Sequence, residues 1–258
     1  MNEMKKTVKA IELEFKSASS EALLSLIGAY ETDTRASVLK LCQKYKKQIE
    51  TQEKLKAEWA DKLYFDETFS GDEKVLVGID EVGRGPLAGP VVACAVVLPK
   101  DCQLLGVKDS KKIAEEKREA LYDEIKAKAL YIGVGIVEAP EIDEINILQA
   151  TFKAMCLALS QIPEAVDVVL VDGDKLIKGV DTLQHAVIKG DDKSAAIAAA
   201  SIIAKVTRDR MMKDYAQTYP HYDWESNKGY GSNAHYNGIR TYGITPLHRK
   251  SFLKNEGF

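Results

Sequence analysis

The amino-acid sequence predicts an α/β fold: one mixed sheet with helices on both faces, preceded by a small helical extension. From residue 74 onward, short apolar runs alternate with amphipathic runs, which is typical of strands and helices packed in layers. Residues 1–68 differ, because they contain no proline and only one glycine, Gly28. Their apolar residues recur at roughly helical spacing, so this part of the chain is expected to be helical.

Three helices are expected in the extension, over about residues 3–16, 19–30 and 33–62. The third also carries six lysines: Lys40, Lys44, Lys46, Lys47, Lys54 and Lys56. The Phe-Ser-Gly-Asp stretch at residues 69–72 ends the helical pattern and marks a boundary. The chain is therefore divided into a helical N-terminal extension, residues 1–70, and an α/β domain, residues 71–258.

Five apolar runs predict the five strands of the sheet. They span residues 74–80, 90–99, 131–138, 167–174 and 185–192. Helices are expected over residues 115–129, 141–159 and 194–216. The first half of the last helix is apolar nearly all round, so it is expected to be buried on several sides. The tail from Tyr219 is rich in Gly, Tyr, His and Asn and gives no regular pattern.

Composition excludes several classes of protein. No apolar run is long enough to span a bilayer, and the first residues mix acidic and basic side chains, unlike a secretory signal. The four cysteines are scattered without a CxxC pair, which argues against a zinc or disulfide framework and favours the reducing cytoplasm. The net charge of −3 means that any nucleic-acid site must be locally basic.

Acidic residues stand at the ends of three predicted strands. Asp80 and Glu81 end the first strand, Asp172 ends the fourth, and Asp191 and Asp192 follow the fifth. Ligand sites in α/β sheets gather at strand ends, where distant segments converge. Two like charges 4 Å apart repel by about 4 kcal/mol at an effective dielectric of about 20, so converging carboxylates would need cations. Mg²⁺ and Mn²⁺ suit such oxygen ligands.

Each acid also has a simpler interpretation. Acidic residues after a strand are commonly solvated turn residues, as Asp174 would be after Gly173. Asp192 would serve equally well as a cap of the helix that begins near Ser194. The pair Asp80–Glu81 fits a turn less well, because it interrupts an apolar strand directly before a glycine-rich stretch.

That glycine-rich stretch is Gly83-Arg84-Gly85, in the sequence GRGPLAG. It is not a dinucleotide-binding fingerprint, because the third glycine is one residue late and a strand follows instead of a helix. Glycines instead let the main chain approach a ligand closely. Arg84 would add a phosphate contact or brace a carboxylate.

Taken together, these stretches resemble bacterial ribonuclease HII over roughly residues 74–253. The matching pieces, in order, are GIDEVGRGPLAGPVVACAVVLP (78–99), VKDSKKI (107–113), EIDEINILQAT (141–151), VLVDGD (169–174), VIKGDDKSAAIAAASIIAKVTRD (187–209), KGYGSNAHY (228–236) and TPLHRKSF (245–252). The resemblance implies a ribonuclease H-type catalytic domain over residues 71–258, with a five-stranded mixed sheet and a helical C-terminal segment. Residues 1–70 resemble the helical extension of some members.

The activity implied by the resemblance is that of a metal-dependent endoribonuclease. Such an enzyme cleaves the RNA strand of RNA–DNA hybrids and nicks duplex DNA on the 5′ side of embedded ribonucleotides, leaving 3′-hydroxyl and 5′-phosphate ends. Its cofactor would be Mn²⁺ or Mg²⁺, with one of two ions activating water and the other stabilising the leaving oxygen. A cytoplasmic monomer with no membrane partner is expected.

The resemblance also assigns roles to individual residues. The catalytic acids are Asp80, Glu81, Asp172 and Asp191, of which Asp80, Glu81 and Asp172 are metal ligands. Asp192 remains an alternative to Asp191, because the two are adjacent. Substrate-binding residues are Gly83, Arg84 and Gly85 at the 2′-hydroxyl, Tyr230 stacked on the neighbouring sugar, and Lys108 at a phosphate. Further phosphate contacts are expected from Lys111, Lys205, Arg208 and Arg249.

Two other functions stay open. A ribonuclease HIII-like enzyme would share the acids and need longer RNA stretches, although it carries a different glycine-rich motif. A noncatalytic hybrid-binding protein would have no use for four acids beside a polyanion. The lysine-bearing helix of the extension would either add affinity for the hybrid or serve as a packing or docking appendage.

Overall fold

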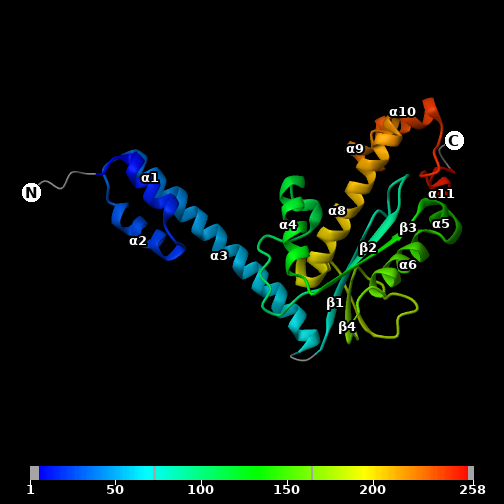
Figure 1. The fold of residues 1–258 in the computed structure, drawn as a ribbon, viewed down its shortest axis with the longest axis horizontal. Coiled ribbons are helices and arrows are strands. Elements are labelled where there is room, and N and C mark those ends of the chain that lie inside the picture. The colour runs from blue at the N-terminus through cyan, green and yellow to red at the C-terminus, as the bar shows by residue number, and fades with distance from the viewer. Residues whose placement is uncertain (1–5, 72–73, 164, 255–258) are drawn as a thin grey trace, which may run out of the picture. The chain divides into compact units, whose positions relative to one another are not determined.

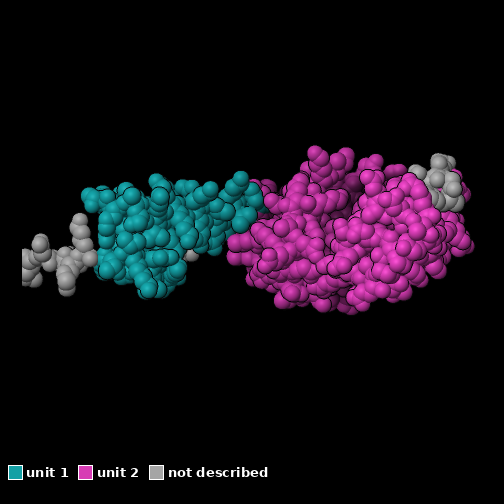
Figure 2. Space-filling model, turned by 90° about the horizontal axis from the view of Figure 1, so that it is seen from above, with its two compact units in different colours: residues 1–58 teal, residues 59–258 magenta. Residues whose placement is uncertain are grey.

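The computed structural model describes residues 6–71, 74–163 and 165–254. The chain forms two compact units, residues 1–58 and residues 59–258 (Figure 2). The helix α3, Ala36–Ser70, runs through the boundary between them. The expected division at residue 70 stays a prediction; α3 ends there, and Gly71 follows it with a positive φ of 57°.

The first unit contains α1 (Val8–Ser17), α2 (Ser20–Tyr30) and the first part of α3. Thr7 and Ser19 cap the first two helices by accepting from Ala10 N and Ala22 N. A small core fills the space between these helices, with the rings of Phe15 and Tyr45 stacked at 4.8 Å. The three expected helices are therefore present. The expected start of the first helix, at residue 3, lies outside the described residues.

The second unit is built on a five-stranded sheet (Figure 1). Its strands are β1 (Leu76–Val82), β2 (Val91–Val97), β3 (Tyr131–Val137), β4 (Val168–Asp172) and β5 (Leu183–Val187), in the order β3-β2-β1-β4-β5. The β1–β2 and β2–β3 pairs are antiparallel, whereas β1–β4 and β4–β5 are parallel. The predicted five-stranded mixed sheet is confirmed. Asp191 and Asp192 lie beyond β5, on the short helix α7 (Gly190–Lys193).

Helices cover both faces of this sheet. The long helix α8 (Ala195–Thr218) and α4 (Glu115–Lys128) pack with one face, and α5 (Ala139–Ile145) and α6 (Ile147–Leu159) with the other. The first turns of α8 are buried all round, as predicted. They press against β1 so closely that a Cβ on Gly78 would lie 2.2 Å from the Ala196 carbonyl carbon.

The helix predicted over residues 141–159 is two helices. Asn146 separates them with a positive φ of 66°, and its Oδ1 accepts from Leu148 N and Gln149 N to cap α6. Beyond α8, the tail folds into the 3₁₀ turn η2 (Pro220–Tyr222), α9 (Trp224–Asn227), α10 (Asn233–Tyr242) and α11 (Lys250–Leu253). These short helices close around the fully buried Trp224.

Candidate active site

The strand order brings the predicted acids together. Ile79 of β1 pairs with Val171 of β4, so the next residues, Asp80 and Asp172, stand at the same level on neighbouring strands. From β5, the chain turns into α7, where Gly190 N donates to Asp172 Oδ1 at 2.7 Å. The following residue is Asp191. Carboxylates from β1, β4 and α7 therefore converge at one edge of the sheet.

These carboxylates lie in each other's electric field. Asp80 is only 8% exposed, and burial raises its pKa well above the ordinary value, with further rises from the charges of Glu81, Asp172 and Asp191. Burial also raises the pKa of Glu81, against the opposing charge of Arg84. The pKa of Asp191 rises through burial and then through Asp172. A carboxylate cluster of this kind is destabilised in its ionised form.

The chemistry of these donors fits divalent cations. Buried, mutually repelling carboxylate oxygens are the ligands that Mg²⁺ and Mn²⁺ take in proteins, and the cations would offset the repulsion. Within the described ranges, no three His, Cys, Asp or Glu side chains already form a ready-made ion-binding group. Three of the carboxylates accept hydrogen bonds within the protein: Asp80 from Glu81 N at 2.7 Å, Glu81 from Arg84 Nη1 at 3.2 Å, and Asp172 from Gly190 N.

The other acids of the sequence lie less favourably for such a site. Asp192 is exposed and pairs with Lys112 Nζ at 2.8 Å, which lowers its pKa. The alternative in which Asp192 caps α8 is wrong, because the cap is Ser194, whose Oγ accepts from Ile197 N. Asp174 is exposed beyond the end of β4. This arrangement supports Asp191 as the fourth acid.

The glycine-rich loop after β1 is held from inside by two arginines. Arg249 is fully buried and donates to the carbonyl oxygens of Gly83 at 2.6 Å, Arg84 at 3.0 Å and Gly89 at 2.8 and 3.0 Å. Arg208 is also fully buried and donates to Pro90 O, Ala88 O and Lys228 O.

The expectation that these two arginines contact phosphate is wrong. Their N–H groups satisfy main-chain carbonyls in the interior, where such groups need partners. Lys205 is also partly buried and pairs with Asp209 at 2.7 Å. The pattern of apolar residues in the sequence does not reveal a buried arginine. Because most arginines are exposed, an arginine in a polar motif is expected at the surface.

Tyr230 lies beside the glycine-rich loop. A Cβ on Gly85 would lie 3.6 Å from Tyr230 Cε1, and the Tyr230 side chain is 42% exposed. Its carbonyl oxygen accepts from His235 Nδ1 at 2.9 Å. The structure therefore places the predicted 2′-hydroxyl-binding loop and the predicted stacking tyrosine next to each other.

Behind Tyr230 lies a buried pair of histidines that sequence reasoning left without a role. Thr245 N donates to His248 Nδ1 at 2.9 Å, which leaves Nε2 as the protonated nitrogen of the neutral ring. That nitrogen lies 3.1 Å from His235 Nε2, which also accepts from Trp224 Nε1. Burial lowers the pKa of His248 to about 4. The neutral pair fixes the backbone at Tyr230.

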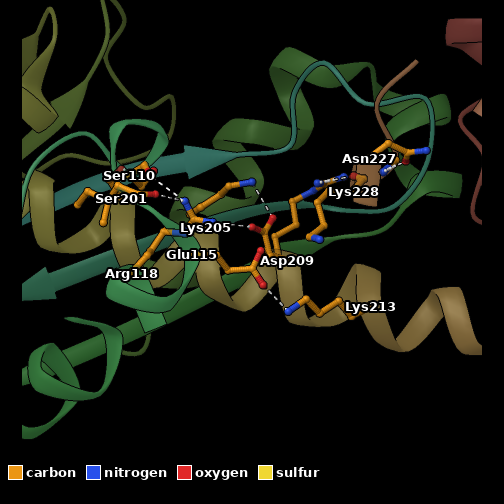
Figure 3. Close-up of polar contacts among 12 residues, drawn as sticks. Ser110, Glu115, Arg118, Ser201, Lys205, Asp209, Lys213, Asn227 and Lys228 are labelled. Carbon is orange, nitrogen blue, oxygen red and sulfur yellow. Dashed lines mark hydrogen bonds and ion pairs between the residues drawn. The ribbon is translucent and has the colours of Figure 1, made fainter. Parts of the chain in front are cut away.

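The loop that carries Lys108 is anchored by a polar network on α8 and α4 (Figure 3). Arg118 donates to Ser110 O at 2.8 Å and Ile113 O at 3.0 Å, and its guanidinium also pairs with Asp209. Ser201 Oγ bonds to Ser110 Oγ at 3.0 Å. Lys108 and Lys111 are exposed on this anchored loop. Lys112 of the same loop reaches Asp192, so the loop lies beside α7.

Comparison with known proteins identifies the family. The family model described as Ribonuclease HII matches residues 77–255, and the Ribonuclease HII N-terminal domain matches residues 7–70. Ribonuclease HII of Bacillus subtilis strain 168 is 47% identical over 233 residues, which cover 90% of this chain and 91% of that protein.

Solved structures agree in fold. Ribonuclease H2 from Pyrococcus horikoshii OT3 superposes with a TM-score of 0.58 at 29% identity, covering 68% of this chain and 92% of that one. Bst-RNase HIII, solved in complex with Mn²⁺, superposes with a TM-score of 0.55 at 19% identity, covering 71% and 68%, which shows a shared fold alone. The expected ribonuclease H fold is thus confirmed, and the chain belongs to the ribonuclease HII family of endoribonucleases.

Proposed function

We propose that the chain hydrolyses the RNA strand of RNA–DNA hybrids and nicks duplex DNA on the 5′ side of embedded ribonucleotides, leaving 3′-hydroxyl and 5′-phosphate ends. The observation that carries this proposal is the convergence of Asp80, Glu81, Asp172 and Asp191 at one sheet edge. The edge follows directly into the loop that approaches Tyr230. Two of the acids, at the end of β1, and the main-chain surface for sugar recognition, in the loop that follows, therefore lie within a few residues of each other.

The four acids would hold two divalent cations, Mn²⁺ or Mg²⁺, with Asp80, Glu81 and Asp172 as ligands and Asp191 beside them. Bound ions would neutralise charge on the scissile phosphate and increase the acidity of an attacking water. Burial of Asp80 keeps its carboxylate poorly solvated, so a cation gains more there than at an exposed acid. Arg84 counters the charge of Glu81.

Recognition of the ribose would come from the glycine-rich loop. Since Arg249 occupies the carbonyl oxygens of Gly83 and Arg84, the loop offers its N–H groups and the exposed Arg84 side chain to a ligand. A 2′-hydroxyl can accept from such groups, whereas a deoxyribose offers nothing there. The half-exposed ring of Tyr230 would pack on the neighbouring sugar, and Lys108 would contact a phosphate.

Two rival functions are less well supported. A ribonuclease HIII-like specificity would not need Tyr230 beside a Gly-Arg-Gly loop. A noncatalytic binder would suffer from buried acids, which repel a polyanion unless cations are present.

The test is cleavage of a labelled duplex that contains one ribonucleotide, with Mg²⁺, Mn²⁺ or EDTA. We expect a metal-dependent nick on the 5′ side of the ribonucleotide, and none from Asp80→Asn. Cleavage of a long hybrid without that nick would favour the HIII-like function. An active Asp80→Asn variant would refute metal catalysis by these acids.

We further propose that the enzyme works as a monomer in the cytoplasm. All four cysteines are free thiols, which suits a reducing compartment. Among the described residues, no helix combines the length and apolarity needed to cross a membrane.

A further inference from the structure

The last turns of α3 bond to the main chain around the fourth acid. Lys62 is 6% exposed, and its Nζ donates to the carbonyl oxygen of Asp191 at 2.8 Å. One turn later, Asp66 Oδ2 accepts from Ala196 N at 2.9 Å, at the start of α8. Both residues belong to the second compact unit, residues 59–258. The last turns of α3 therefore bond to Asp191 itself and to the start of α8, five residues further along the chain.

The segment that carries Asp191 has little support of its own. The helix α7 spans four residues and is entered through Lys189, which has a positive φ of 56°. Its internal hydrogen bonding includes Ser194 N to Gly190 O at 2.7 Å. A helix this short is not stable by itself. The direction of the Asp191 side chain therefore depends on contacts from outside α7.

The type of contact is informative. The Lys62 ammonium bonds to the main-chain oxygen of Asp191, which leaves the carboxylate available for a ligand. Burying an ammonium is costly unless its contacts compensate. A second tie comes from Gly190 N to Asp172 Oδ1. Lys62 and Asp172 thus hold successive residues of α7 from different elements.

We propose that Lys62 is a positioning residue for the Asp191 carboxylate, so that the end of α3 is part of the support of the metal site. This inference rests on the proposed function, in which Asp191 lies at that site. Asp66 assists by fixing the first turn of α8, to which α7 leads.

Charge and position predict opposite results when Lys62 is replaced. A nearby ammonium repels a cation, so removing its charge alone would tighten metal binding. Losing the tie to Asp191 O would instead let the carboxylate move and weaken metal binding. The sign of the change therefore separates the two effects.

The experiment compares wild type, Lys62→Met, Lys62→Gln and Lys62→Arg in the full chain. Lys56→Met is the matched control, because Lys56 lies exposed on the same helix. Mn²⁺ affinity is measured without substrate, by electron paramagnetic resonance of free Mn²⁺. The Mn²⁺ concentration for half-maximal cleavage and the melting temperature are measured alongside.

We expect Lys62→Met to weaken Mn²⁺ affinity by about tenfold or more, the range found when groups that orient metal ligands are removed. Lys62→Arg, which keeps a charged donor, should recover part of that loss, and Lys56→Met should match wild type. If Lys62→Met does not fold, as judged by circular dichroism, Lys62→Gln carries the same expectation with a smaller loss.

Unchanged or tighter Mn²⁺ binding in the folded Lys62 variants, with any loss of cleavage following the melting temperature, would overturn the positioning role. Absence of Mn²⁺ binding by the wild-type chain would overturn the proposed function itself, and this inference with it. The two failures are therefore distinguishable.

Discussion

At the scale of single residues, the basic side chains around the candidate site are of two kinds, buried and exposed. Arg208 and Arg249 are fully buried and bond to the main chain of the glycine-rich loop, whereas Lys108 and Lys111 are exposed. The guanidinium suits the first task, because its planar fork donates several hydrogen bonds in fixed directions. The loop's shape is thus set from beneath, by residues distant in sequence.

Replacement of Arg249 should therefore lower the free energy of unfolding even when the positive charge is kept. Arg249→Lys would lose most of the four bonds to carbonyl oxygens, and we expect the free energy of unfolding to fall by about 2–4 kcal/mol. Urea denaturation measures this change. The exposed Arg240 provides the control: Arg240→Lys should stay within about 0.5 kcal/mol of wild type. Equal stability of the two variants would contradict the clamping role.

The buried histidines predict a dependence of stability on pH. Burial lowers the pKa of folded His248 from 6.5 to about 4, so the unfolded chain binds the extra proton between these values. Stability should therefore fall as pH drops from about 6.5 to about 4, by up to about 1.4 kcal/mol per pH unit. Denaturant titrations at several pH values across this range measure the free energy of unfolding. Its slope against pH should be shallower for His248→Gln than for wild type. His221→Gln, at an exposed histidine, is the control and should match wild type. An identical dependence of unfolding free energy on pH in wild type and both variants would refute this account.

At the scale of elements, the two ends of α3 differ in the side chains that they carry and in the unit to which they belong. Its first part belongs to the helical unit 1–58 and carries exposed lysines, while its last turns belong to the unit 59–258 and bury Trp59, Lys62 and Asp66. Lys40, Lys44 and Lys47 recur at helical spacing, which places them along one stripe. We propose that this stripe adds nonspecific affinity for the substrate backbone.

Neutralising the stripe tests that role. The triple change of Lys40, Lys44 and Lys47 to Gln should weaken binding to a hybrid. It should also reduce the slope of log K against log salt by up to about 3, at about 0.9 for each lost phosphate contact. Fluorescence anisotropy at several salt concentrations measures the slope. Lys56→Gln, on another face of α3, should leave it unchanged. An unchanged slope in the triple variant would favour a packing or docking role.

Elements and site differ in how far the sequence predicts them. Apolar runs predicted the five strands and the buried α8, because period and burial are local properties. The break at Asn146 was missed, since it depends on one amide capping α6 from a positive φ. That the acids converge depends on the sheet order, which places β4 beside β1. Periodicity does not encode that order, so only the family resemblance indicated which acids belong together.

At the scale of the whole molecule, the clustered carboxylates that would bind metal lower the stability of the metal-free protein. Asp80 is buried among other carboxylates, and its raised pKa in the folded state means that ionising it costs stability as pH rises. A cation that binds only the folded chain would restore stability by mass action. The metal-free enzyme is therefore expected to be the less stable form.

This expectation gives a prediction for Asp80→Asn. At neutral pH without metal, the variant should be more stable than wild type, because it removes a buried carboxyl group from a cluster of repelling carboxylates. It should also lose most of the rise in melting temperature that Mn²⁺ gives to wild type. Differential scanning fluorimetry with EDTA and with Mn²⁺ measures both. A less stable metal-free variant would contradict the picture of repelling acids.

The hydrogen bonds made by the last turns of α3 determine where the N-terminal extension can be removed without disturbing the candidate site. A chain that begins at residue 71 would lack Trp59, Lys62 and Asp66, and with them the bonds to Cys102 O, Asp191 O and Ala196 N. Its weaker cleavage would reflect a disturbed acid, and would be mistaken for lost substrate affinity. A fair truncation keeps the helix from residue 59 onward, so that only the lysine-bearing part is removed.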